Sequence, residues 1–90
     1  MSFEILYDRN CLEKDIHRLD KPTLKRIKST IEERLSIAPT DFGKPLRYTG
    51  ENLWSLRVGD WRIIYKITEN QIWILKIGHR REVYNFLLTK

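Results

Sequence analysis

The sequence predicts a two-layer α+β fold, with an N-terminal strand and a helical hairpin packed on a mainly antiparallel sheet. Three observations predict this fold. Apolar residues recur at helical spacing up to residue 35, and they alternate with polar residues from residue 53 onward. Two of the three prolines lie between these regions, within residues 36–45. The predicted order is strand, helix, helix, strand, strand, strand, with a short C-terminal segment.

Composition restricts the class of protein. The chain has 90 residues, which fit one domain over 1–90, and 41% of them are hydrophobic, which excludes disorder. Apolar stretches are too short to span a bilayer, and the first residues lack the pattern of a signal peptide. A single cysteine and two histidines argue against a disulfide, a metal site or a cofactor. We therefore expect a cytoplasmic protein without a membrane partner, and its net charge of +5 predicts an acidic partner, either nucleic acid or protein.

The N-terminal half predicts one strand and two helices. Residues 2–7 read as a short strand. Asn10 and Glu13 have the spacing of a capping box, in which each side chain satisfies a backbone N–H of the other, so we expect a helix to start there. Pro22 fits the first turn of a second helix. That helix has an apolar stripe made of Leu24, Ile27, Ile31 and Leu35. Residues 36–45 are predicted to be a surface loop.

Two hairpins follow, built from strands over residues 53–58, 61–67 and 71–77. Gly59 and Asp60 are a two-residue turn signal, which pairs Arg57 with Arg62. One face of the first hairpin is then apolar and should pack under the helices; it holds Trp54, Leu56, Val58, Trp61, Ile63, Tyr65 and Ile67.

The second hairpin has two possible registers. A three-residue turn would pair Tyr65 with Trp73 and place Leu75 on the apolar face and Lys76 beside Arg62. A two-residue turn would drive Lys76 into the core, so the three-residue turn is predicted. The remaining residues read as a short polar tail with one apolar patch, Phe86, Leu87 and Leu88.

This register gathers Arg57, Arg62 and Lys76 on the outer face of the sheet. Like charges opposite one another destabilise a sheet by roughly 0.2–1 kcal/mol, so stability alone gives no reason to collect them. His79, Arg80 and Arg81 follow the last strand and add to a positive site that would attract phosphate. Cations that simply extend into water are an equally good interpretation of this spacing.

These strands resemble a known family. Residues 53–65, LWSLRVGDWRIIY, are similar to the RVGDYRIIY core of RelE/ParE-superfamily toxins of toxin–antitoxin systems. Residues 77–84, IGHRREVY, resemble the IGHRxxVY ending of the RelE branch, and residues 44–47 with Gly50 resemble the KPLKG step before the first hairpin strand. The resemblance covers nearly the whole chain.

The resemblance implies a metal-independent endoribonuclease, an mRNA interferase that cuts mRNA in the ribosomal A site by attack of a ribose 2′-hydroxyl on the adjacent phosphate. Arg57, Arg62 and Arg80 match basic residues that stabilise the phosphate, and Tyr84 matches a tyrosine that stacks on a base or orients the hydroxyl. Further basic residues are assigned to RNA contacts: Lys44, Arg47, Lys76 and Arg81. The implied partners are the ribosome, mRNA and a cognate RelB-like antitoxin in a hetero-oligomeric complex.

The general base is less well defined by the resemblance. Ser55 stands where some relatives carry a lysine, and a serine without an activating partner cannot act as a base. The pKa of a histidine side chain is the one nearest neutrality, so His79 is the predicted base, with Lys76 second.

Two other functions are compatible with the sequence. The ParE branch implies a non-catalytic inhibitor of DNA gyrase on the same fold, and the positive charge alone would suit a plain RNA-binding domain. The convergence of Arg57, Arg62, Arg80 and Tyr84 favours the ribonuclease, because an inhibitor that acts through protein contacts has no need of a phosphate site.

Overall fold

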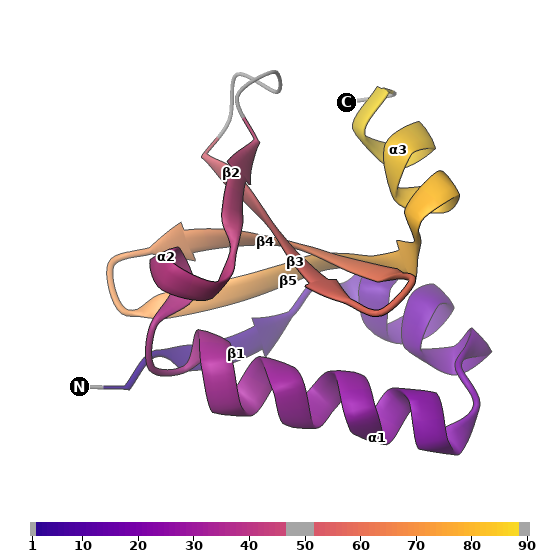
Figure 1. Ribbon diagram of the computed structural model, residues 1–90, viewed down its shortest axis with the longest axis horizontal. Helices are drawn as coiled ribbons and strands as arrows, with labels where there is room; N and C mark the ends of the chain where they lie inside the picture. The colour runs from indigo at the N-terminus through magenta and orange to yellow at the C-terminus, as the bar shows by residue number, and fades with distance from the viewer. Residues whose placement is uncertain (1, 47–51, 89–90) are drawn as a thin grey trace.

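A computed structural model describes residues 2–46 and 52–88 and shows one five-stranded sheet (Figure 1). The strand order is β1-β5-β4-β3-β2, with β1 parallel to β5 and the other pairs antiparallel. The strands are β1 (Glu4–Tyr7), β2 (Lys44–Leu46), β3 (Leu53–Val58), β4 (Trp61–Thr68) and β5 (Gln71–His79). The α+β class and the predicted order of elements are confirmed, and β2 is an additional edge strand within the expected loop.

Helical segments lie on both faces of the sheet. The N-terminal ones are η1 (Cys11–Asp15), η2 (Ile16–Arg18), α1 (Lys21–Thr30), η3 (Ile31–Leu35) and α2 (Pro39–Phe42), and the C-terminal one is α3 (Arg80–Leu88). In Figure 1, α1 runs below the sheet, whereas α3 rises above it from the end of β5. We call these two sides of the sheet the α1 face and the α3 face. Among the described residues, no helix is long and apolar enough to cross a membrane.

The start of the first helix differs from the prediction. Asn10 is already helical and its side chain caps nothing, so the predicted capping box is wrong. Asp8 takes that place, because its Oδ2 accepts a hydrogen bond from the Asn10 backbone N–H at 3.0 Å. Glu13 instead forms an ion pair with Arg9. The second helix starts as predicted, with Asp20 as its cap and a proline in the first turn.

The α1 face carries the larger core. Three residues of the predicted stripe, Ile27, Ile31 and Leu35, are fully buried there, whereas Leu24 is half-buried. Tyr65 packs among them and its hydroxyl donates to the Pro39 carbonyl at 2.5 Å. Several further residues complete this cluster: Cys11, Leu56, Val58, Ile63, Ile72, Ile74 and Ile77, with Trp54 and Trp61 packed against it. The hairpin between β3 and β4 has the predicted register, with Gly59 at φ 60° in its turn.

The register of the second hairpin is not the predicted one. Thr68 pairs with Gln71 across a two-residue turn, and a β-bulge leaves Leu75 unpaired between the pairs Tyr65–Ile74 and Ile64–Lys76. Lys76 therefore lies opposite Ile64, and Gly78 lies opposite Arg62. The prediction failed because it weighed only regular ladders. A two-residue turn combined with a bulge also keeps the lysine out of the α1-face core.

As a result, one aromatic and one aliphatic side chain, those of Trp73 and Leu75, lie on the α3 face instead of the α1 face where they were expected. Trp73 pairs with Lys66 rather than Tyr65, and Leu75 packs in a second cluster on the α3 face. That cluster contains Leu53, Ile64 and Val83, with Leu46, Leu75, Phe86 and Leu87 packed against it. The C-terminal segment is thus a helix that covers part of the second face. The predicted polar tail is wrong because Val83, Phe86 and Leu87 have helical spacing and pack on the sheet, whereas Leu88 of the predicted patch is exposed.

The burial of both faces can be tested by truncating neighbouring residues of β4. Ile63 and Ile64 point to opposite faces and are both fully buried. We expect Ile63→Ala and Ile64→Ala each to lower the free energy of unfolding by about 2–5 kcal/mol. The measurement is urea denaturation followed by tryptophan fluorescence. A negligible loss for Ile64→Ala would contradict the packing of α3 on the sheet.

Stability should also fall at alkaline pH. Burial raises the pKa of Tyr65 and of Tyr7 from 10.0 to about 12, and burial together with Asp15 raises the pKa of Cys11 from 9.0 to about 12. The folded state therefore holds protons that the unfolded state releases first. Stability from these groups is complete below pH 9 and is lost as the pH rises toward 12. In Tyr65→Phe, the slope of unfolding free energy against pH should be shallower between pH 10 and 12; an unchanged slope would contradict this.

Candidate phosphate site

Three arginines meet on the α3 face beside the turn between β3 and β4. Arg57 and Arg62 are direct cross-strand partners, and Arg80 is the first residue of α3. The Arg80 backbone N–H donates to the carbonyl of Asp60 at 3.2 Å, which ties the start of α3 to the turn. Nη1 of Arg62 donates to the carbonyl oxygens of Gly59 and Trp61, each at 3.1 Å. We call Arg57, Arg62 and Arg80 the arginine cluster.

The charges of this cluster act on one another. The pKa of Arg62 is lowered, first by burial and then by the positive charges of Arg57 and Arg80, while Asp60 opposes the shift. A guanidinium this destabilised gains more than an isolated one when an anion arrives. Two of the three arginines stand on paired strands, and guanidinium groups bind phosphate oxygens in a bidentate way. The cluster is therefore suited to a phosphate with developing negative charge.

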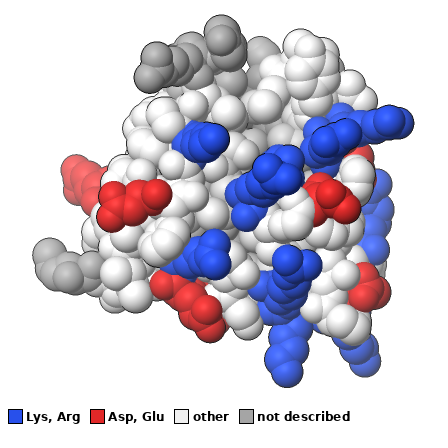
Figure 2. All heavy atoms as spheres, viewed as in Figure 1, with Lys and Arg blue, Asp and Glu red and all other residues white. Residues whose placement is uncertain are grey.

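A shallow pocket of about 450 Å³ continues from the cluster along α3. It is lined by Arg80, Arg81, Tyr84 and Asn85, and the Tyr84 side chain is 64% exposed. An exposed aromatic ring next to cations is a platform on which a base can stack. Figure 2 shows basic side chains gathered over the side of the molecule where α3 begins. The structure thus brings the predicted residues Arg57, Arg62 and Arg80 together, and it places Tyr84 and Arg81 beside Arg80 in the pocket.

His79 is not brought to the same face. It pairs with Trp61, and the two rings meet edge to face with centroids 5.9 Å apart. Trp61 packs on the α1-face core, whereas Arg62, the next residue, points to the α3 face. The sheet therefore separates His79 from Arg57 and Arg62.

The other predicted RNA contacts have different positions. Lys44 is exposed on β2 and pairs with Ser55, two residues before Arg57 on the same face. Contrary to the prediction, Lys76 does not lie beside Arg62. It forms a largely buried ion pair with Asp15, with 2.8 Å between Nζ and Oδ1. Arg47 and Gly50 lie outside the described residues.

Two residues in the neighbourhood of the site, Asp15 and Arg26, were not predicted from the sequence. Asp15 is only 4% exposed, and it stands four residues after the buried Cys11, a helical spacing that indicates the same inward face. Arg26 of α1 reaches the β3–β4 turn. Its Nη1 lies 3.4 Å from the point that a Cβ would occupy if residue 59 were not a glycine. No pattern in the sequence distinguishes Arg26 from its basic neighbours on α1.

No group of three or more potential metal ligands occurs within residues 2–46 and 52–88.

The arginine cluster should cost the protein stability. Arg57 is exposed and faces Arg62 directly, so Arg57→Gln removes repulsion without deleting a packed side chain. We expect the free energy of unfolding to rise by up to about 1 kcal/mol, with a larger gain at low salt. Arg62 is a poorer test because its bonds to the turn carbonyls would also be lost. A clear loss of stability in Arg57→Gln, measured by urea denaturation at two salt concentrations, would contradict the repulsion.

Comparisons with known proteins complete the description of the site. The sequence model of a family described as the ParE toxin of the type II toxin–antitoxin system parDE matches residues 10–84. No curated protein matches the chain in sequence.

Several solved structures are similar. The RelBE2 toxin–antitoxin complex from Mycobacterium tuberculosis has a chain that is 27% identical, with a TM-score of 0.81 over 89% of this chain and 93% of that one. The archaeal RelE–RelB complex from Pyrococcus horikoshii is 25% identical, with a TM-score of 0.71 over 89% and 97%. A mutant of the E. coli toxin RelE in the free state is 15% identical and shares the fold, with a TM-score of 0.75 over 99% and 97%.

Proposed function

The chain belongs to the RelE/ParE superfamily of toxins, in its RelE branch, and from this premise we propose that it is a ribosome-dependent mRNA endoribonuclease. The protein is the toxin of a toxin–antitoxin system. The observation that supports the finer assignment is the arginine cluster, in which Arg57, Arg62 and Arg80 converge although their charges repel. Repulsion of this kind is typical of a site that binds an anion.

The proposed reaction is a transesterification within the RNA. The ribose 2′-oxygen loses its proton and forms a bond to the adjacent phosphorus, and the bond from phosphorus to the 5′-oxygen breaks. The products are a 2′,3′-cyclic phosphate and a 5′-hydroxyl, the leaving oxygen having taken up a proton. Negative charge on the phosphate increases in the transition state, so cations held in place beforehand stabilise it more than the substrate.

Each residue of the site has a distinct proposed role. Arg57 and Arg62 bind the phosphate from the paired strands. Arg80 stabilises the same phosphate or protonates the leaving oxygen, and Tyr84 stacks on a neighbouring base across the pocket. Arg81 and Lys44 are proposed to contact the RNA backbone, where each adds affinity rather than rate.

The role of His79 as base remains a prediction with its own test. If His79 takes the proton, His79→Ala should lower the cleavage rate at every pH and should flatten its dependence on pH. Because the sheet separates His79 from Arg62, an unchanged pH profile in His79→Ala would assign the proton transfer to another group. Single-turnover cleavage from pH 5 to 9 is the measurement.

The proposed partners follow the same reasoning. The structures most like this chain in sequence among those described above are complexes with RelB-type antitoxins, so we propose a cognate antitoxin and a hetero-oligomeric complex. Acidic residues of the antitoxin would meet the arginine cluster, which predicts an association rate that falls with salt.

Removal of cluster arginines tests the proposed chemistry. We expect Arg62→Ala and Arg80→Ala each to lower the single-turnover cleavage rate on programmed ribosomes by about a hundredfold or more. Ribosome binding should change much less, because many other cations contribute to it. Arg62→Lys should restore only part of the rate, since an ammonium cannot bind two oxygens as a guanidinium does. The matched control is Lys66→Ala, an exposed cation of β4 away from the turn.

The family description favours one alternative, a ParE-like inhibitor of DNA gyrase. Primer extension on mRNA shortly after expression separates the two functions. Cuts within codons support the ribonuclease, whereas intact mRNA with gyrase-dependent DNA breaks supports the inhibitor. Full cleavage by the double variant Arg62→Ala, Arg80→Ala would overturn the roles proposed for these arginines.

A further inference from the structure

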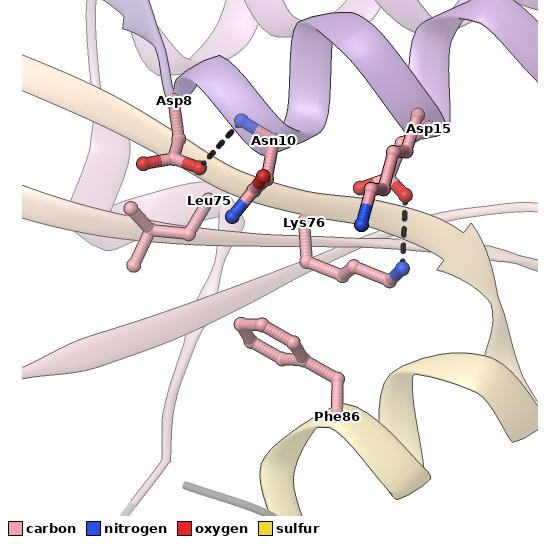
Figure 3. Close-up of a pocket in the computed structure, with 7 residues that line it drawn as sticks. Asp8, Asn10, Asp15, Leu75, Lys76 and Phe86 are labelled. Atoms are coloured by element: carbon pink, nitrogen blue, oxygen red, sulfur yellow. Dashed lines mark hydrogen bonds and ion pairs between the residues drawn. The ribbon is translucent and has the colours of Figure 1, made fainter.

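Two charged contacts connect α3 to the first helical segments, although about 60 residues of chain separate them. Lys76 of β5 bridges the two elements, with its Nζ 2.8 Å from Asp15 of η1 and 6.0 Å from the ring centre of Phe86 on α3. Arg18 of η2 forms an ion pair with Glu82 of α3. Figure 3 shows the lysine extended between the carboxylate above it and the aromatic ring below. The contacting residues Glu82 and Phe86 lie on the same helix as Arg80, Arg81 and Tyr84, which are proposed to bind RNA.

Asp15 is held by the edge of β5 as well as by the lysine. Its Oδ2 accepts a hydrogen bond from the Ile77 backbone N–H at 3.1 Å, while Oδ1 binds the lysine. The ladder between β1 and β5 ends at the pair Tyr7–Ile74, so the Ile77 N–H lies beyond its reach and the carboxylate takes the place of a strand. Both oxygens are thus engaged, and the side chain has one orientation.

Lys76 has its position set by the bulge and by this carboxylate. The bulge at Leu75 turns the lysine to the α3 face, and its side chain is only 19% exposed. A lysine removed from water needs a counter-charge, which Asp15 supplies, and the aromatic face of Phe86 offers a further attraction. The lysine stem also fills space near Gly78, where α3 packs closely: Cε of Lys76 lies 3.5 Å from the position of a Cβ on Gly78.

Helix α3 follows β5 without an intervening loop and packs on the sheet through Val83, Phe86 and Leu87 of the α3-face cluster. Its first backbone N–H, that of Arg80, donates to the carbonyl of Asp60 in the turn. Its first two turns carry Arg80, Arg81 and Tyr84, which line the pocket. A small rotation of this helix would therefore move the site residues relative to Arg57 and Arg62.

We propose that Asp15 and Lys76 are positioning residues: they hold α3 against η1 and so keep Arg80 and Tyr84 aligned with the paired-strand arginines. The ion pair of Arg18 with Glu82 is a second, exposed tether of the same helix. This inference rests on the proposed ribonuclease function for its consequence, but the effect on α3 is independent of it. Neither positioning residue touches the RNA in this proposal.

The experiment uses three variants of the whole chain. Lys76→Met keeps the stem and removes the charge, and Lys76→Arg keeps a cation for both Asp15 and Phe86. Ile31→Val is the control, because it weakens the α1-face core, far from α3. Amide hydrogen exchange of α3 is measured relative to β4, and cleavage is measured on programmed ribosomes at saturation and at half-saturation.

We expect α3 amides of Lys76→Met to exchange about tenfold faster relative to β4, with normal ratios in Lys76→Arg and Ile31→Val. The cleavage rate at saturation should fall by about tenfold to a hundredfold in Lys76→Met alone, because misplaced groups react slowly. The half-saturating ribosome concentration should stay within about twofold, whereas a lysine that contacts RNA would change that concentration instead.

Other outcomes overturn separate parts of the inference. Unchanged amide exchange of α3 in Lys76→Met contradicts the proposal that Asp15 and Lys76 hold α3 against η1. Faster exchange of α3 with an unchanged cleavage rate contradicts the proposal that they align the site residues. If the unaltered protein cleaves no mRNA, the proposed function fails, while the exchange measurement still decides whether Asp15 and Lys76 hold α3. Asp15 can be tested in the same way with Asp15→Asn. This variant keeps an acceptor for the Ile77 N–H but lacks the charge that pairs with Lys76.

Discussion

The β-bulge at Leu75 is the constraint on which the rest of the structure depends. Without it, the two-residue turn of the second hairpin would put Lys76 opposite Ile63, inside a core that is closed to water. Burying an unpaired ammonium there would cost far more than the one ladder position that the bulge gives up. With the bulge, Lys76 faces α3 and reaches Asp15 from the rim of the sheet. The same shift sets Gly78 opposite Arg62, and the missing side chain leaves room for α3 to approach.

The sheet supports the site because both of its faces are buried. Helix α1 and the segments around it cover one face and α3 covers part of the other, so β3 and β4 are held rigidly where they carry Arg57 and Arg62. Their turn accepts bonds from both the Arg62 side chain and the Arg80 backbone. Repulsion among the three guanidinium groups is therefore opposed by covalent geometry, turn hydrogen bonds, packing and the charge of Asp60. Such a preorganised cluster suits the phosphate binding that we propose for it.

Family membership and site geometry contribute different parts of the functional argument. The match over residues 10–84 establishes a toxin of the RelE/ParE superfamily, a fold on which both catalytic and non-catalytic inhibitors are expected. The arginine cluster with the Tyr84 pocket favours RNA chemistry within that choice. His79 lies beside Trp61 on the α1 face, so the sheet separates it from the arginines proposed to bind the phosphate.

Local patterns in the sequence determined most of the strand and helix order, the first hairpin and the Arg57–Arg62 pair. Alternation along residues 53–67 and the Gly59-Asp60 turn specify the Arg57–Arg62 pair by themselves, because a two-residue turn leaves one register. Tertiary structure decided the second hairpin, the helical C-terminus and the partner of Lys76. The partner of Lys76, Asp15, lies 61 residues away in the chain, and the register of the second hairpin depends on a bulge that keeps a charge out of the core. No local pattern reports such a contact, since its energy exists only once η1, β5 and α3 have come together.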